Sequence, residues 1–218
     1  MKWQKRKKAT NTLLQYLLPI NIFYYIKAKF KGASLFCKIC YYNYMEIFII
    51  NINNAEKVSE ETLKHYQKKD ISVEEKRKIH CLSYLLVDKF LEEVYGIESR
   101  EIVFDNGKPM LVDGGKYFSI SHSGELIVIA FSDSNCGIDV EQIKLREFQS
   151  IAERMNFEAN TLGEFYDEWT KYEALYKLGK DREYGSTANF ELDGYILTAA
   201  SEDPCEEFDI YYQAEEEN

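Results

Sequence analysis

The stretch GIDVE at residues 137–141 decides how this sequence is interpreted. It has the character of a strand, in which residues two apart point to the same side, so Asp139 and Glu141 project together. Two adjacent carboxylates repel each other and raise each other's pKa unless a cation lies between them. Hard oxygen ligands of this kind suit magnesium, although a solvated strand face would carry the same residue types.

A second motif, WTKYEALYK at residues 169–177, lies in a segment whose periodicity predicts a helix from Leu162 to Leu178. Glu173 and Lys177 are four positions apart and therefore face the same way. They fit an ordinary intrahelical ion pair. They equally fit a third metal ligand beside a cation that binds phosphate. The residues alone leave both interpretations open.

Two further motifs precede the strand carboxylates. The segment FSISHSG at residues 118–124 reads as a strand that ends in a Ser/His turn closed by glycine. His122 in this turn fits a general base, a phosphate contact or a plain turn residue. No order of Ser, His and acid with a nucleophile elbow is present, which argues against serine hydrolysis. Upstream, the GKP turn holds Lys108 beside the rigid Pro109.

The remaining pattern predicts a mixed arrangement of helices and strands. Ser72 followed by Glu75 predicts a capping box that opens a long helix, and Gly96 ends it. Because helices and strands do not alternate as in a wound parallel sheet, the predicted fold class is α+β. Strands are expected at 45–52, 101–105, 117–121, 126–132, 136–141, 194–200 and 207–213, with a shorter helix after Ser59.

The charge distribution excludes one class of partner. The formal net charge is -10, yet residues 1–44 hold nine basic residues and no acidic one. The remainder therefore carries 18 basic and 37 acidic residues. A body this acidic does not bind nucleic acid non-specifically. It can bind a polyanionic small molecule only through a local basic cluster or a metal ion.

The basic segment 1–44 admits three interpretations: a spurious or disordered extension, a membrane-associating segment, or an integral part of the fold. Its apolar stretch from Leu13 to Ile26 is shorter than the roughly 20 apolar residues that a membrane span needs. Met45 then begins what looks like the first strand of a soluble domain. The five cysteines are odd in number and lack a repeating spacing, which favours a reducing, cytoplasmic location.

Taken together, the four motifs in this order and spacing resemble the 4'-phosphopantetheinyl transferase superfamily, of the surfactin-synthetase-activating type. The resemblance runs from about Met45 to Lys177 and more loosely to the C-terminus. It implies two similar lobes related by a pseudo-twofold axis, each a small, mainly antiparallel sheet packed on a long helix. The expected lobes are residues 45–135 and a shortened second lobe at 136–218, preceded by the extension 1–44.

The resemblance also implies an activity: magnesium-dependent transfer of 4'-phosphopantetheine from coenzyme A to a serine of an acyl, peptidyl or polyketide carrier protein. Glu173 and Lys177 would be catalytic, in a protein that acts as a monomer. Coenzyme A would lie between the lobes. The implied ligands are Asp139, Glu141 and Glu173 for magnesium, Lys177 for the pyrophosphate, Ser121 and His122 for the 3'-phosphate, Lys108 and Pro109 for the adenine, and Arg77 for the nucleotide.

Two departures from the family pattern support an alternative. Tyr172 stands where the family has a lysine directly before the helix glutamate, and Lys171 is displaced by one position, a rotation of about 100 degrees on a helix. The segment from Gly179 to Asp193 is also short. These departures suit a non-catalytic relative that binds coenzyme A or a carrier protein. An unrelated magnesium-dependent phosphohydrolase is a third hypothesis.

Overall fold

The structure, a computed structural model, describes residues 25–31, 43–54, 59–67, 71–105, 107–179, 185–203 and 205–213. The strands are β1 (Tyr25–Lys31), β2 (Asn43–Asn51), β3 (Ile102–Asp105), β4 (Lys108–Leu111), β5 (Tyr117–Ser123), β6 (Leu126–Ser132), β7 (Cys136–Gln142), β8 (Ser186–Leu192), β9 (Tyr195–Ser201) and β10 (Cys205–Gln213). The helices are α2 (Glu60–Tyr66), α3 (Glu74–Glu93), α4 (Gln149–Met155) and α5 (Leu162–Leu178), with a 3-10 turn at Ile52–Asn54.

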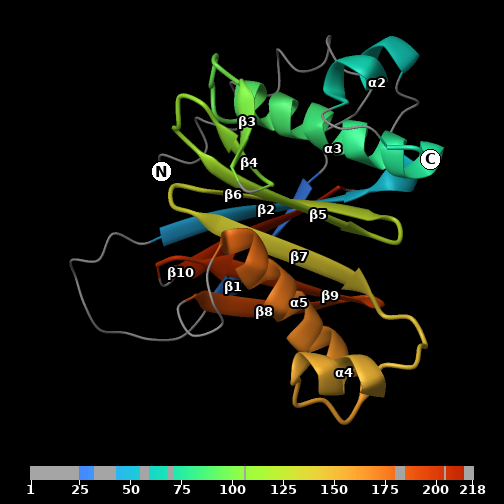
Figure 1. The fold of residues 1–218 in the computed structure, drawn as a ribbon. Helices are drawn as coiled ribbons and strands as arrows, with labels where there is room; N and C mark the ends of the chain where they lie inside the picture. Colours follow the sequence, from blue (N-terminus) through green and yellow to red (C-terminus); the bar gives the residue numbers. More distant parts are fainter. Residues whose placement is uncertain are drawn as a thin grey trace, which may run out of the picture.

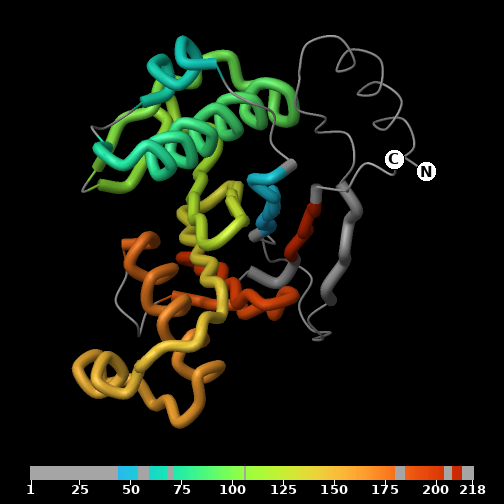
Figure 2. The backbone as a smooth tube through the Cα atoms, turned by 90° about the vertical axis from the view of Figure 1, so that its right-hand side faces the viewer, coloured from blue at the N-terminus to red at the C-terminus, as the bar shows by residue number. Residues whose placement is uncertain are grey.

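Two main sheets form the centre of the molecule. The larger has the strand order β1-β10-β2-β6-β5, and the smaller has the order β7-β9-β8. Most neighbours are antiparallel, but β10 runs parallel to β2, so the last strand of the chain returns to the first sheet. Figure 2 shows this strand, in red, beside the blue strand β2. The hairpin of β3 and β4 stands apart from both sheets.

The two sheets pack between two long helices (Figure 1). Helix α3 packs on one face of the larger sheet, where Phe90, Phe118 and Phe131 are fully buried. The opposite face of that sheet meets the smaller sheet through apolar side chains such as Ile47 and Ile138. Helix α5 covers the other side of the smaller sheet and contacts both β7 and β9. The layers therefore run helix, sheet, sheet, helix.

The sequence motifs at the starts of the two long helices differ in how well they predict where each helix begins. Helix α5 has the predicted bounds, because Thr161 and Glu164 form a reciprocal capping box at its start. The capping box predicted from Ser72 and Glu75 is wrong. Helix α3 begins one residue later, with Val73 in the N-cap position and no described side chain capping it.

The predicted α+β class is confirmed, and each expected strand is present within a few residues. Strand β1, strand β4, helix α4 and strand β8 were not predicted; Lys108 and Pro109, expected in a turn, begin strand β4. Strand β1, at residues 25–31, pairs antiparallel with β10, while most of the extension 1–44, including its apolar stretch up to residue 24, lies outside the described residues. No helix in the described part of the chain is long and apolar enough to cross a membrane.

One glycine sets the distance between α5 and β7. A Cβ atom on Gly137 would lie 2.0 Å from the carbonyl oxygen of Ala174 and 3.0 Å from the backbone nitrogen of Leu178. Both of these contacts are with helix backbone, which cannot rotate away as a side chain does. The first residue of the GIDVE motif is therefore a glycine because α5 touches the strand backbone at this point.

We predict that Gly137→Ala lowers the free energy of unfolding by about 1–3 kcal/mol or more, since α5 must shift away from β7 to make room. The matched control is Gly163→Ala in the first turns of the same helix, where an added Cβ meets no described atom within 4 Å. That change should leave stability equal or raise it by up to about 1 kcal/mol through helix propensity. Urea unfolding followed by circular dichroism measures both, and equal stabilities would contradict the role given to Gly137.

Candidate functional site

The carboxylates predicted from the GIDVE and WTKYEALYK motifs come together where α5 crosses β7. Asp139 and Glu141 lie on β7, and Glu173 and Lys177 lie on the facing turns of α5. Strand periodicity places the first pair on one side of β7, and helical periodicity places the second pair on one face of α5. The close approach at Gly137, described above, brings these two surfaces into contact.

Asp139 is the most buried member of this cluster, with a side chain only 6 % exposed. Its Oδ1 atom accepts hydrogen bonds from Ser121 Oγ at 2.8 Å and from Lys177 Nζ at 2.7 Å. Lys177 Nζ also donates to the carbonyl oxygen of Ile138 at 3.0 Å. The other oxygen, Oδ2, is buried and has no hydrogen-bond partner among the described residues. One oxygen of this buried carboxylate is thus left without a described hydrogen-bond donor.

Glu141 lies two residues further along β7 and is half-buried. Its Oε2 atom accepts a hydrogen bond from Ser123 Oγ at 2.7 Å. Burial raises the pKa of the Glu141 carboxyl, and the charge of Asp139 raises it further. Hydrogen bonds from Ser123 and Trp169 and the charge of Lys177 oppose this shift, but burial outweighs them and the pKa stays raised.

Glu173 faces the same two carboxylates from α5. Burial is the largest cause of the raised pKa of its carboxyl, and the charges of Asp139 and Glu141 raise the pKa further. Lys177 lowers it, but not enough to cancel the other effects. In this cluster the positive charge of Lys177 is outnumbered by three carboxylates. Full ionisation of these carboxylates is therefore disfavoured unless another cation is present.

The chemistry of this donor set fits a hard divalent cation such as magnesium. All three candidate ligands are carboxylates, and Asp139 Oδ2 is an open, buried acceptor. Within the described ranges, no three His, Cys, Asp or Glu side chains are grouped closely enough to hold a metal ion. The three carboxylates are therefore neighbours by their electrostatic effects on one another, but in this arrangement they are not close enough to form a ready ligand set.

Lys108 and Pro109 lie on β4, and together with residues 114–118, which lead into β5, they line a small cavity of about 100 Å³. The Lys108 ammonium is directed to the start of β7, where it donates to Asn135 and, at 3.0 Å, to the carbonyl oxygen of Cys136. Asn135 in turn donates to the carbonyl oxygen of Leu178 at the end of α5, at 2.9 Å. Burial lowers the pKa of Lys108.

Ser121 and His122 are adjacent on β5 but face opposite ways. The Ser121 side chain is buried against β7, whereas His122 is exposed. Arg77 lies elsewhere, at the start of α3, and forms ion pairs with Glu60 at 3.1 Å and Glu74 at 2.9 Å. The contacts of Arg77 are therefore on α2 and α3, while the carboxylate cluster is on β7 and α5. An anion must compete with two glutamates to reach Arg77.

Sequence reasoning missed several residues that contact the cluster. Ser123 and Trp169 both bond Glu141, and Ser119 bonds the backbone of β7. Tyr172, the departure from the family pattern, packs in an aromatic cluster with Phe157 and Trp169, at ring centroid distances of 6.1 and 6.4 Å. The alternating serines of FSISHS were a visible signal, because every second residue of a strand faces the same neighbour.

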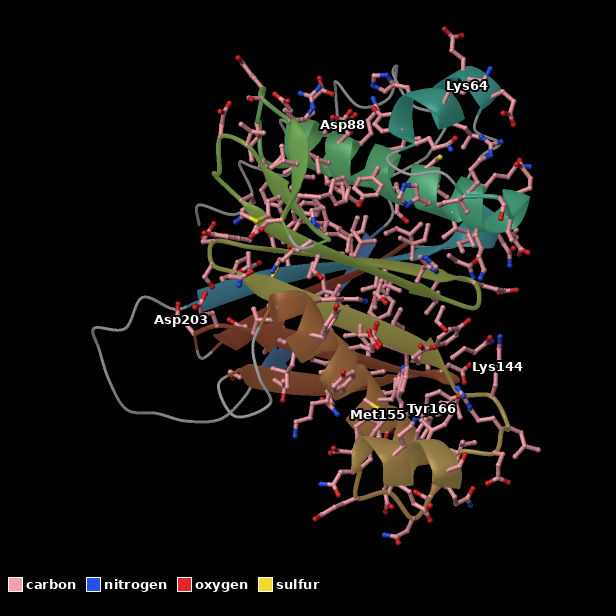
Figure 3. All side chains as sticks on the ribbon, in the orientation of Figure 1. Lys64, Asp88, Lys144, Met155, Tyr166 and Asp203 are labelled. Atoms are coloured by element: carbon pink, nitrogen blue, oxygen red, sulfur yellow. The ribbon has the colours of Figure 1, made fainter. Side chains whose placement is uncertain are left out.

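The loop that follows the carboxylate strand is attached to α5. Tyr166 Oη donates to the carbonyl oxygen of Lys144 at 3.2 Å and accepts from the Lys144 backbone nitrogen at 3.3 Å. Both residues are labelled in Figure 3, where Tyr166 lies on α5 close to the loop. This double contact holds the end of β7 in place beside the helix that carries Glu173.

Comparison with known proteins supports the resemblance drawn from the motifs. The chain is 33% identical over 146 residues to the 4'-phosphopantetheinyl transferase psf-1 of Bacillus pumilus, covering 57% of this chain and 62% of the relative. It is 33% identical over 113 residues to the 4'-phosphopantetheinyl transferase gsp of Aneurinibacillus migulanus, covering 45% and 47% respectively. No protein-family model matches the chain.

The chain thus spans less than two thirds of the length of the curated relatives that it matches. The resemblance to the 4'-phosphopantetheinyl transferases is nonetheless confirmed by two relatives from different organisms. The roles of the individual residues stay predictions.

We predict that Glu173→Gln raises the melting temperature of the metal-free protein at neutral pH, because it removes one of three mutually repelling carboxylates. The folded-state pKa of Glu173 is raised, so its ionisation opposes folding above that pKa. The gain should shrink as the pH falls from the raised folded-state pKa to the ordinary glutamate value of 4.5, and it should be absent well below 4.5, where Glu173 is protonated in both states.

Calorimetry in a chelating buffer from about pH 4 to about pH 8 measures this difference. The exposed Glu191 on β8 provides the control variant Glu191→Gln. A Glu173→Gln protein that melts at or below the wild-type temperature at neutral pH would contradict the repulsion inferred among the carboxylates.

Proposed function

We propose that this relative of the 4'-phosphopantetheinyl transferases transfers 4'-phosphopantetheine from coenzyme A to a serine of an acyl or peptidyl carrier protein, in a reaction that depends on magnesium. The observation that carries the proposal is the cluster of Asp139, Glu141, Glu173 and Lys177, with its open, buried Asp139 Oδ2. The two curated relatives support the reaction class. A surplus of negative charge explains why a polyanionic substrate requires a cation here.

In this proposal Asp139, Glu141 and Glu173 hold the magnesium ion. When bound, magnesium supplies charge neutralisation to the pyrophosphate of coenzyme A and stabilises the charge that develops in phosphoryl transfer. Lys177 now donates to Asp139, and we assign its ammonium to the pyrophosphate once the substrate is bound. The same lysine thus balances the carboxylates before the substrate arrives.

The transfer step needs a base for the carrier serine. The serine hydroxyl attacks the β-phosphorus of coenzyme A, forming a new O–P bond while the pyrophosphate P–O bond breaks. Adenosine 3',5'-bisphosphate leaves with the bond's electron pair, and the serine proton passes to Glu173 directly or through a water molecule. The bound cation would keep the Glu173 carboxyl ionised and therefore able to accept this proton.

The remaining site residues are proposed to bind the nucleotide end of coenzyme A. Lys108 and Pro109 line the small cavity beside β5 and are assigned to the adenine. His122, with Ser121, is assigned to the 3'-phosphate, and Arg77 to the nucleotide after release from Glu60 and Glu74. Coenzyme A would then lie between lobes at 45–135 and 136–218, related by a pseudo-twofold axis.

One alternative has specific support. Tyr172 packs among aromatic rings where the family has a phosphate-binding lysine, and Arg77 is already paired with two glutamates. A non-catalytic relative that binds coenzyme A or a carrier protein would tolerate both features. Such a protein would bind coenzyme A without transferring any part of it, which the following experiment detects.

We predict that the full-length protein with coenzyme A and magnesium adds one phosphopantetheine to an apo carrier protein, and that chelation of the metal abolishes the addition. Asp139→Asn should lower the rate by about 100-fold or more, because a charged ligand is lost at the reacting centre. Mass spectrometry of a panel of apo fatty-acid, polyketide and peptide carriers measures the transfer.

The control is Asp193→Asn, which neutralises an exposed carboxylate in the turn between β8 and β9 and should keep the wild-type rate. Transfer that persists in Asp139→Asn would refute the site. Coenzyme A binding without transfer to any carrier would favour the non-catalytic alternative.

A further inference from the structure

The edge of the smaller sheet is joined to the larger sheet by serine side chains. Strands β5 and β7 belong to different sheets, yet β7 lies directly against β5. The backbone N–H groups of Ile138, Val140 and Gln142 on β7 donate to serine hydroxyl groups on β5 and not to a backbone carbonyl. The acceptors are Ser119 at 3.1 Å, Ser121 at 3.3 Å and Ser123 at 3.1 Å.

The three contacts keep a constant sequence offset of 19 residues, so β7 runs parallel to β5. Both strands repeat every two residues, which is why a serine at each second position of β5 meets each outward N–H of β7. An exposed sheet edge normally needs covering, because its backbone groups are otherwise unpaired. The serines cover this edge and connect the two sheets at the same time.

Two of the three serines make a second contact that the third does not make. Ser121 Oγ donates to Asp139 Oδ1 at 2.8 Å, and Ser123 Oγ donates to Glu141 Oε2 at 2.7 Å. Ser119 accepts from the β7 backbone in the same way, but no described carboxylate accepts from it. We call this row of contacts between the β5 serines and β7 the serine seam. It contains two serines with a carboxylate partner, Ser121 and Ser123, and one without a described carboxylate partner, Ser119.

We propose that Ser121 and Ser123 are positioning residues, which orient Asp139 and Glu141 for the divalent cation while they join the two sheets. The inference rests on the proposed function for the identity of the cation, and it assigns Ser121 a role toward the carboxylate in addition to any contact with substrate. Each serine fixes one oxygen of its carboxylate, which leaves the other oxygen available as a ligand. The open Asp139 Oδ2 is the clearest instance.

This arrangement has a physical advantage for a cluster of like charges. A hydroxyl group donates to a carboxylate without adding a charge, so it fixes the side chain while leaving the cluster's attraction for a cation intact. Lys177 also fixes Asp139 Oδ1, but its positive charge reduces that attraction. Groups that orient metal ligands in this manner typically change metal affinity by about 10- to 100-fold when removed.

The test compares Ser121→Ala, Ser123→Ala and Ser119→Ala in the full-length protein. Manganese binding is measured by electron paramagnetic resonance of the free ion, with thermal melting as the measure of folding. Each substitution removes one acceptor from a β7 N–H group, so all three lose stability for the same reason. Only the first two also release a carboxylate.

We expect Ser121→Ala and Ser123→Ala to weaken manganese binding by about 10-fold or more, while Ser119→Ala binds as the wild type does. Ser123→Ala should also need more magnesium for carrier modification, with the maximal rate recovered at saturating metal. If Ser121→Ala does not fold, Ser123→Ala at the half-buried end of the seam decides the question by itself.

Equal manganese affinity in all folded variants, in a wild type that modifies carriers, would overturn the positioning role and leave the proposed function standing. Weaker binding confined to Ser121→Ala and Ser123→Ala, in a wild type without transfer, would support the positioning role and count against the proposed function. A wild type that binds no manganese would overturn both.

Discussion

The contact between α5 and the backbone of β7 at Gly137 is the constraint on which the rest of the site depends. A side chain at this position would hold the helix away from the strand, and Glu173 and Lys177 would lose their place opposite Asp139. The capping box at the start of α5 and the contact of Tyr166 with the following loop fix the helix along its length. The site is therefore built from the packing of one helix on one strand, before any ligand is bound.

The same strand connects the two sheets. On its inner side β7 pairs with β9, and on its outer edge it receives the serine hydroxyl groups of β5. Lys108 and Asn135 add a second link, from β4 through the turn before β7 to the end of α5. Strand β10 adds a third link, because it follows β9 of the smaller sheet along the chain and pairs with β2 of the larger sheet. Asp139 and Glu141, which we propose as ligands of the cation, therefore lie on a strand that is held from several directions, as electrostatic pre-organisation requires.

The sequence predicted those features that depend on local periodicity or on short motifs. The bounds of α5 and the strand that carries Asp139 follow from repeats of 2 and 3.6 residues, whereas the grouping of the strand and helix carboxylates was implied only by the family resemblance. The parallel return of β10 to β2 could not be predicted, because it joins segments more than 150 residues apart and leaves no local pattern. The alternating serines of β5 were visible in the sequence, but their contacts with β7 could not be predicted, since alternating serines also occur on a solvated strand. The capping box expected at Ser72 failed because Val73 takes the N-cap position.

In our proposal a divalent cation relieves the repulsion among three carboxylates where α5 packs on β7. An anomalous difference map from crystals grown with manganese and coenzyme A tests this proposal directly. We expect one strong peak within coordination distance of Asp139, Glu141 and Glu173, with Lys177 moved from Asp139 Oδ1 to a phosphate oxygen. Coenzyme A bound without a peak at this cluster, with Lys177 still paired to Asp139, would contradict it.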